Sequence, residues 1–135
     1  MTKLLYPAVL SVALFIALPL VSHASQLDDG VKAYDQQDYP VAYQRLLPLA
    51  EQGAGKAQYY IGEMFVGGMG IPTNMEKGVY WLQKSVENKY HMAAKTLGKM
   101  YMSGFGVPMN PAKGAEYLVL YQSLSADDEV EPECD

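Results

Sequence analysis

The stretch GGMGIPTN at residues 67–74 returns as SGFGVPMN at residues 103–110, which is 36 positions later (103 − 67). The likeness extends in both directions, because ten of the 26 positions are identical when residues 57–82 are aligned with residues 93–118. Unrelated segments of average composition would share roughly one or two. The chain therefore contains a sequence repeat, and a period of this length is typical of helical arrays.

Each copy of the repeat indicates two helices joined by a glycine corner. Within residues 57–65, apolar side chains fall at i, i+4, i+7 and i+8, which places them on one face of a first helix. The glycine pair suits a left-handed turn at the end of this helix, and Pro72 prevents helix until Asn74 begins the next one. The spacing of a phosphate-binding loop is absent. We predict six helices, at residues 28–37, 39–52, 55–66, 75–88, 92–102 and 111–124.

A weaker third copy precedes these two. A further shift of 36 residues aligns Asp38 with Asn74 and Asn110. All three side chains can accept hydrogen bonds from the free N–H groups at the start of a helix. The expected fold is all-α, an α/α superhelical solenoid of antiparallel helix pairs with about three repeats, of which the first is atypical.

The shared pattern is A-x(3)-[IL]-G-x-M-[FY]-x(2)-G-x-G-[IV]-P-x-N-x(2)-K-G-x(2)-[WY]-L. It resembles the Sel-1-like repeat, a relative of the tetratricopeptide repeat, over most of the chain from about Asp28 to Leu124. The resemblance implies a solenoid used for protein–protein contact, often in exported bacterial proteins. Lys89 stands where the family usually has glycine, so a left-handed turn there should be strained or shifted to Asn88. The cysteine-rich branch of the family, and the β-lactam-related activity attributed to it, is not implied.

The first 24 residues are typical of an export signal. Lys3 precedes an apolar run at residues 4–21, and a small-x-small site ends at Ala24. The alternative is an uncleaved membrane anchor, but the run contains two prolines and falls short of the ~20 residues that a spanning helix needs. We therefore expect a signal peptide at residues 1–24, a Sel-1-like solenoid at residues 25–126, an acidic disordered tail at residues 127–135, and a periplasmic or secreted protein.

Charge restricts the class of partner. Residues 25–126 carry nine acidic and nine basic residues, whereas the tail DDEVEPECD carries six acids and no base. Nucleic acid and an anionic membrane surface both require a basic patch, so neither is expected as a partner. The predicted partner is another protein or a peptide, with no membrane contact after signal cleavage.

No pattern of residues predicts an enzyme, a cofactor or a metal site. The nucleophile motifs are absent, and His91 is the only histidine beyond Ala24. The alternative is a copper site made by His91 with the methionines at 92, 100 and 102, although Met100 repeats Met64 in an apolar stripe. Cys134 is the only cysteine, and is either incidental or the source of an intermolecular disulfide.

Two surfaces are candidates for binding. In such solenoids the first helix of each unit lines the concave face. The exposed stripe predicted there has six members: Tyr59, Glu63, Val66, Lys95, Lys99 and Met102. Glu63 and Lys99 should be neighbours, either in a solvated salt bridge or in a mixed-charge groove that receives a peptide. The second candidate is an apolar C-terminal end, which would dock a partner or a second copy to give a homodimer: Val119, Leu120, Tyr121 and Leu124.

The predicted function is that of an exported, periplasmic helical-repeat adaptor, which acts by steric binding and not by catalysis. A more specific alternative comes from the resemblance, since small exported proteins of this kind include immunity-type inhibitors of toxic effectors. The contrasting alternative is a hydrolase with an unrecognised site.

Overall fold

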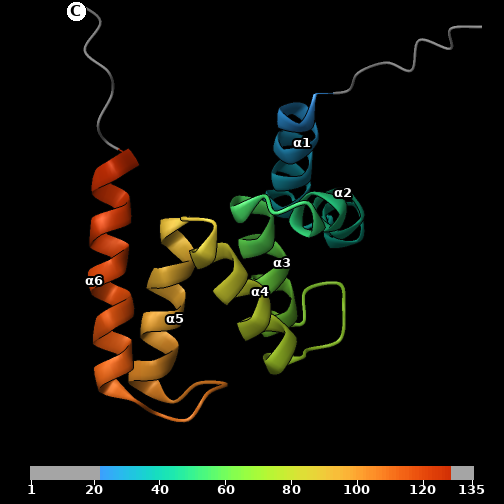
Figure 1. Cartoon of the computed structure of the whole chain (residues 1–135). Helices are drawn as coiled ribbons and strands as arrows, with labels where there is room; N and C mark the ends of the chain where they lie inside the picture. The colour runs from blue at the N-terminus through green and yellow to red at the C-terminus, as the bar shows by residue number, and fades with distance from the viewer. Residues whose placement is uncertain (1–21, 129–135) are drawn as a thin grey trace, which may run out of the picture.

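The computed structural model describes residues 22–128 and shows an array of α-helices without strands in that range (Figure 1). Most of the predicted signal peptide and residues 129–135 of the predicted tail lie outside the described residues. Helices α1 and α6 stand at the two ends of the array, as Figure 1 shows. The helices are α1 His23–Asp35, α2 Tyr39–Glu51, α3 Gly55–Gly67, α4 Met75–Glu87, α5 His91–Ser103 and α6 Pro111–Asp128.

Two helix boundaries differ from the sequence expectation by four or five residues, and the others agree to within two. Helix α1 begins at His23 and not at residue 28, because the Ser22 side chain accepts a hydrogen bond from the Ser25 N–H and caps the helix. The predicted cleavage after Ala24 therefore falls within the first turn of α1. Helix α6 continues to Asp128, so the first two residues of the predicted tail are helical.

The three predicted caps open the second helix of each pair. Asp38, Asn74 and Asn110 each accept a hydrogen bond from the N–H three residues ahead, at 3.4, 2.9 and 3.0 Å. These contacts use a side-chain oxygen to pair one of the N–H groups that a helix start leaves free. The first turns of α2, α4 and α6 are thus fixed in the same way.

The glycine corners have the predicted left-handed backbone. Gly68 and Gly70 have φ of 64° and 69°, and Gly104 and Gly106 have φ of 73° and 70°. In each corner the first glycine ends a helix, and its N–H donates to the carbonyl of the residue four positions earlier. The glycines therefore turn the chain between the two helices of each pair.

Two further positions adopt positive φ without glycine. Lys89 has φ of 61°, so the turn after α4 is left-handed at Lys89 itself and is not shifted to Asn88. Gln37, in the turn after α1, has φ of 62°. A residue with a Cβ is strained in this conformation, and both turns therefore hold local strain.

The first helix pair differs from the others in its connection. Residues 36–38 join α1 to α2, whereas the longer corners 68–74 and 104–110 join the later pairs. The shorter connection displaces α1 in register, so that α1 aligns with α3 at a spacing of 32 residues (55 − 23) while α2 aligns with α4 at 36 (75 − 39). This is the physical basis of the atypical first repeat.

One close contact is common to all three pairs. A glycine of the first helix faces a leucine of the second, and a Cβ on Gly62 would lie 2.9 Å from Leu82 Cγ. Gly30 faces Leu46 and Gly98 faces Leu118 in the same way. The missing Cβ lets the two backbones approach closely, which explains why a residue of low helix propensity recurs inside these helices.

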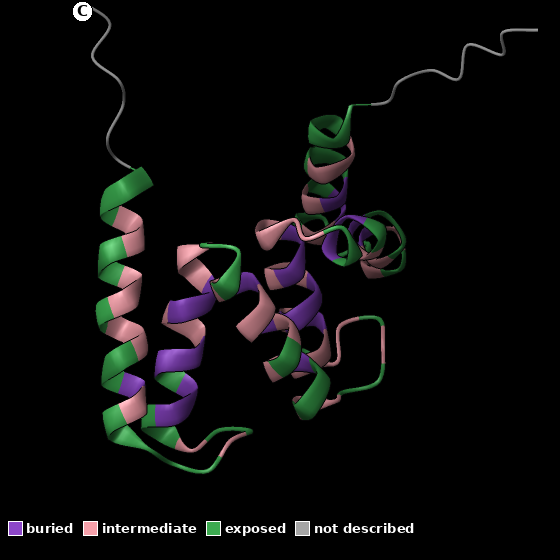
Figure 2. Cartoon of the chain, in the orientation of Figure 1, coloured by how far each residue is buried: buried purple, intermediate pink, exposed green. Residues whose placement is uncertain are grey.

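The core consists of two clusters along the array. One gathers buried side chains of α1, α2 and α3, and the other gathers those of α4 and α5. Figure 2 shows the buried residues concentrated on the inner helices, while α6 is mostly exposed or intermediate. The structure is thus an all-α helical-repeat solenoid, which confirms the predicted fold class.

Candidate functional site

The predicted concave stripe is only partly assembled into one site. Glu63, Val66 and Lys99 line a common pocket of about 280 Å³ between α3 and α5. Met102 does not line it; this side chain is 45 % exposed and packs beside Gly114 of α6. The remaining lining residues of the pocket come from α5 and the second glycine corner: Thr96, Met100, Ser103 and Phe105.

Glu63 lies in this pocket without a cation. The first of the two alternatives, a salt bridge with Lys99, does not form, since the ion pairs made by lysine and arginine among residues 22–128 are Arg45–Asp29 and Lys84–Glu87. The Oε1 atom of Glu63 is buried and has no hydrogen-bond partner. Burial raises the pKa of Glu63, and a hydrogen bond with Thr96 opposes this rise. The groove therefore contains both an acidic and a basic side chain, Glu63 and Lys99, which do not pair with each other.

A continuous row of aromatic rings crosses the array beside Glu63. Ring centroids are 4.7 Å apart for Tyr34 and Tyr60, 5.3 Å for Tyr60 and Tyr59, and 5.3 Å for Tyr59 and Tyr90. His91 then lies 5.5 Å from Tyr90 and 5.8 Å from the final ring. These rings come from α1, α3, the turn before α5, α5 and α6. We call the set the tyrosine row: Tyr34, Tyr60, Tyr59, Tyr90, His91 and Tyr121.

Burial raises the pKa of four hydroxyl groups in the tyrosine row, those of Tyr34, Tyr59, Tyr60 and Tyr90. Burial raises the pKa of Tyr90 to about 12. For Tyr34 and Tyr59, burial and then the charge of Glu63 raise the pKa. None of these side chains is fully buried, so each combines a large apolar ring with a hydrogen-bonding hydroxyl. Such side chains suit recognition of another protein.

Helix α6 closes one end of the tyrosine row. Asp128 Oδ2 lies 2.7 Å from His91 Nδ1, and Lys95 Nζ lies 5.2 Å from the ring centre of Tyr121. Lys95 of the predicted stripe is therefore directed to α6, away from Glu63. These contacts fix the last ring of the row against α5.

The predicted C-terminal end is not a single patch. Val119 is 65 % exposed, but Leu120, Tyr121 and Leu124 are half-buried on another side of α6. Tyr121 belongs to the tyrosine row, and Leu120 lines a separate hollow of about 180 Å³. The four residues do not meet because position 119 is rotated by about 100° from position 120 on a helix.

On α6, the side of the helix that faces away from the array is less apolar than the equivalent side of α4. Val79, Gln83 and Val86 occupy this side of α4, where Val79 and Val86 pack against the core of α5. A shift of 36 residues places Ala115, Val119 and Gln122 there on α6, and all three are exposed. A stripe with one substantial apolar residue is typical of the polar outer face of a terminal repeat.

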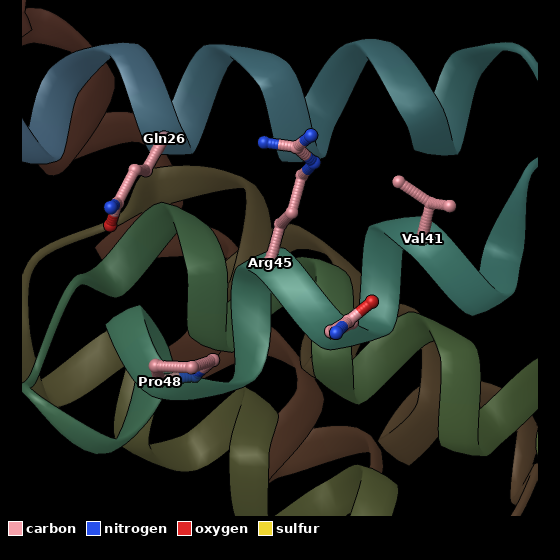
Figure 3. A pocket seen from close by; sticks show the side chains of 5 residues that line it. Gln26, Val41, Arg45 and Pro48 are labelled. Carbon is pink, nitrogen blue, oxygen red and sulfur yellow. The ribbon is translucent and has the colours of Figure 1, made fainter. Parts of the chain in front are cut away.

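The hollow between α1 and α2 lies outside both predicted surfaces. It has a volume of about 490 Å³, and Figure 3 shows Gln26 of α1 opposite Arg45 and Pro48 of α2. Arg45 is paired with Asp29 at 3.3 Å, and both side chains are largely solvated. This hollow therefore offers no unsatisfied group to a ligand.

Two further properties concern the described part of the chain. Residues 22–128 contain no group of three or more His, Cys, Asp or Glu side chains arranged to hold a metal ion. Met100 is 4 % exposed in the core, whereas Met102 is exposed, so these two methionines do not face one site. In the same range no helix combines the length and apolar character needed to cross a membrane.

Sequence reasoning missed three residues of this region. Tyr34 was missed because the shift of 36 residues misaligns α1. A shift of 32 residues would have aligned Tyr34 with Val66. Tyr90 precedes α5 and therefore lies outside any helical stripe. Phe105 is the residue between the corner glycines, and its alignment with Met69 was the available signal.

The stacked helix pairs define a helical-repeat module, a class of fold used for protein–protein interaction. The Sel1 repeat family model matches residues 55–90 and 91–120. The chain is therefore a member of the Sel1-like repeat family. The match leaves out α1 and α2, although these helices pair through the same glycine–leucine contact.

Solved structures show the same fold. A Sel1 repeat protein from Oxalobacter formigenes is 19 % identical, with a TM-score of 0.69 over 76 % of this chain and 82 % of that chain. The protein c5321, a protective antigen present in uropathogenic Escherichia coli strains that displays an SLR fold, is 26 % identical with a TM-score of 0.68. That alignment covers 76 % of this chain and 23 % of c5321. Among curated proteins, no sequence matches this chain.

Proposed function

We propose that this protein is an exported adaptor that binds another protein along the tyrosine row, by steric recognition and without catalysis. The observation that carries the proposal is the continuity of the row from α1 to α6. Six partly buried rings in successive contact offer the rigid, amphipathic contact area that dominates many protein interfaces. Helix pairs hold these rings in place before binding, which lowers the entropic cost of association.

Export rests on the sequence of residues 1–24. Cleavage after Ala24 would remove Ser22, His23 and Ala24 from the described region, and all three are exposed. The cut would therefore cost one helix cap and the 2.9 Å hydrogen bond between His23 Nε2 and Gln52 Oε1, but no buried side chain. Cell fractionation with N-terminal sequencing tests this: we expect a periplasmic protein that begins at Ser25. An intact N-terminus on a cytoplasmic protein would contradict export.

The adaptor role is tested by affinity capture from the native cell envelope. Tyr59→Ala should weaken capture of the partner by at least about tenfold, because central aromatic side chains are frequent hot spots. Tyr80→Ala is the matched control, since Tyr80 is 52 % exposed on α4 and lies outside the row. Circular dichroism must show that both variants remain folded.

The outcome separates three cases. Loss of capture with Tyr59→Ala alone supports the tyrosine row as the binding surface. Equal capture by both variants and the unmodified chain would exclude the row. If the captured protein is a toxic effector whose activity the chain blocks, the adaptor is an immunity-type inhibitor.

A further inference from the structure

The contacts between the first helices of neighbouring pairs differ between the first junction, α1 with α3, and the second junction, α3 with α5. At the first junction, the Tyr34 hydroxyl of α1 donates to Met69 Sδ of the first glycine corner at 3.2 Å. At the second junction the equivalent positions are Val66, by the shift of 32, and Phe105, by the shift of 36. Valine is too short to span the same gap. The pocket of about 280 Å³ opens at this place, and both residues line it.

The pocket contains one polar group that the chain leaves unpaired. Within residues 22–128, Glu63 Oε1 is buried without a hydrogen bond, and no cation lies within ion-pair distance of the carboxylate. A buried carboxylate oxygen without a donor costs free energy, which a bound group with N–H donors would recover.

The nearby lysines do not supply that donor. Lys95 is directed to the ring of Tyr121, and Lys99 is exposed at the rim of the pocket. Tyr34 and Tyr59 lie close enough to Glu63 for its charge to raise the pKa of their hydroxyls. The surroundings of the carboxylate are thus mainly aromatic and apolar, and the Thr96 hydroxyl is the nearby polar group that lowers its pKa by hydrogen bonding.

The rest of the lining suits a long side chain with an apolar stem. Val66 and Met100 are apolar, and Phe105 is 54 % exposed at the edge of the pocket. Three methylene groups can lie along such a wall while a charged head group reaches the carboxylate. A guanidinium group fits better than an ammonium group, because it pairs with a carboxylate through two parallel N–H donors and stacks on an aromatic ring.

We propose that the pocket between α3 and α5 receives an arginine side chain of the partner protein, with its guanidinium group bound by Glu63 and stacked on Phe105. This inference rests on the proposed function, since the arginine belongs to the protein that the tyrosine row binds. The inference specifies which side chain of the partner the pocket recognises. A partner with arginine at this point gains a charge-assisted hydrogen bond that a neutral residue cannot make.

The test uses the isotopically labelled protein, purified as the cell produces it, in NMR titrations with N-acetyl-arginine amide. N-acetyl-citrulline amide is the control ligand, because it has the same length and shape but no charge. We expect the amide signals of Glu63, Thr96 and Phe105 to shift with the arginine probe, and at least about tenfold weaker binding of the citrulline probe. Equal binding of the two probes would overturn the proposal.

Three variants locate the effect. Glu63→Gln should remove the preference for arginine, and Phe105→Ala should weaken arginine binding severalfold while leaving the fold intact, since Phe105 is exposed. Glu51→Gln makes the same change of charge on the exposed side of α2 and should bind like the unmodified chain. If Glu63→Gln and Glu51→Gln bind the arginine probe equally, Glu63 is not the receptor group.

The titration tests the arginine pocket and the capture experiment tests the tyrosine row, so either proposal can be refuted without the other. Capture that depends on Tyr59 but not on Glu63 would keep the adaptor function and overturn the arginine pocket. Arginine binding that depends on Glu63, with capture unaffected by Tyr59, would keep the pocket and remove the tyrosine row as the binding surface.

Discussion

Substitution of the second glycine in each corner should have unequal effects on stability. Gly70 and Gly106 share nearly the same φ, 69° and 70°, so alanine at either position carries a left-handed penalty of about 1–2 kcal/mol. Alanine also restricts the unfolded chain, which offsets about 0.4–1 kcal/mol of this penalty. The backbone contribution is therefore about 1 kcal/mol in both corners.

The surroundings of the added methyl group differ. At Gly70 a Cβ would lie 2.6 Å from Tyr39 Cβ, an atom attached directly to the backbone at the start of α2. At Gly106 the nearest atoms are Met75 Sδ at 2.9 Å and Met100 Cε at 3.2 Å, both in flexible side chains that can move. Overpacking against a rigid atom costs about 1–3 kcal/mol more. We expect Gly70→Ala to lose about 2–4 kcal/mol and Gly106→Ala about 1 kcal/mol.

Urea unfolding followed by circular dichroism measures this difference. With a slope of about 2 kcal/mol per molar urea, each kcal/mol moves the midpoint by about 0.5 M. Gly67→Ala is the control from the same stretch, because this residue has negative φ and its added methyl group would meet only the flexible side chain of Met69. Equal midpoints for Gly70→Ala and Gly106→Ala would refute the packing argument, and no loss in either would refute the left-handed corners.

Three further outcomes are expected. Lys89→Gly and Gln37→Gly should each raise the urea midpoint by an amount equivalent to about 0.5–1 kcal/mol, since both residues have positive φ; a lower midpoint would contradict the strain. Asn74→Ala and Asn110→Ala should each lose about 1 kcal/mol in thermal unfolding, and unchanged melting would show that the caps are not used. Glu63→Gln should alter the pH dependence of stability. Because the folded state raises the pKa of Glu63, the unmodified chain loses stability as pH rises from the ordinary carboxyl range through that raised value. The melting temperature of Glu63→Gln relative to the unmodified chain should therefore be higher at pH 7 than at pH 4; an equal difference at both pH values would contradict the buried, unpaired carboxylate.

Local signals were sufficient to predict the helix pairs and their corners. Glycine pairs followed by proline and asparagine have few backbone solutions, so Gly68 and Asn74 could be assigned from sequence alone. The start of α1 could not, because Ser22 lies within the apparent signal sequence and the short connection at residues 36–38 breaks the period.

The site was less predictable because repeat equivalence fixes the position of a backbone and not the direction of a side chain. Glu63 and Lys99 are equivalent and do line one pocket, yet they form no ion pair, since Lys99 extends into solvent. The tyrosine row depends on Tyr90, which is in a turn, and on Tyr121, which sequence reasoning had assigned to another surface.

The exposed stripe on α6 determines how this protein could be made longer. A fourth helix pair appended after Asp128 would meet Ala115 and Gln122 where α4 offers Val79 and Val86 to the pair that follows it. Duplication of the last 36-residue unit would thus produce a weak joint unless positions 115 and 122 became aliphatic as well. An artificial extension of the array would therefore need substitutions at two positions of α6.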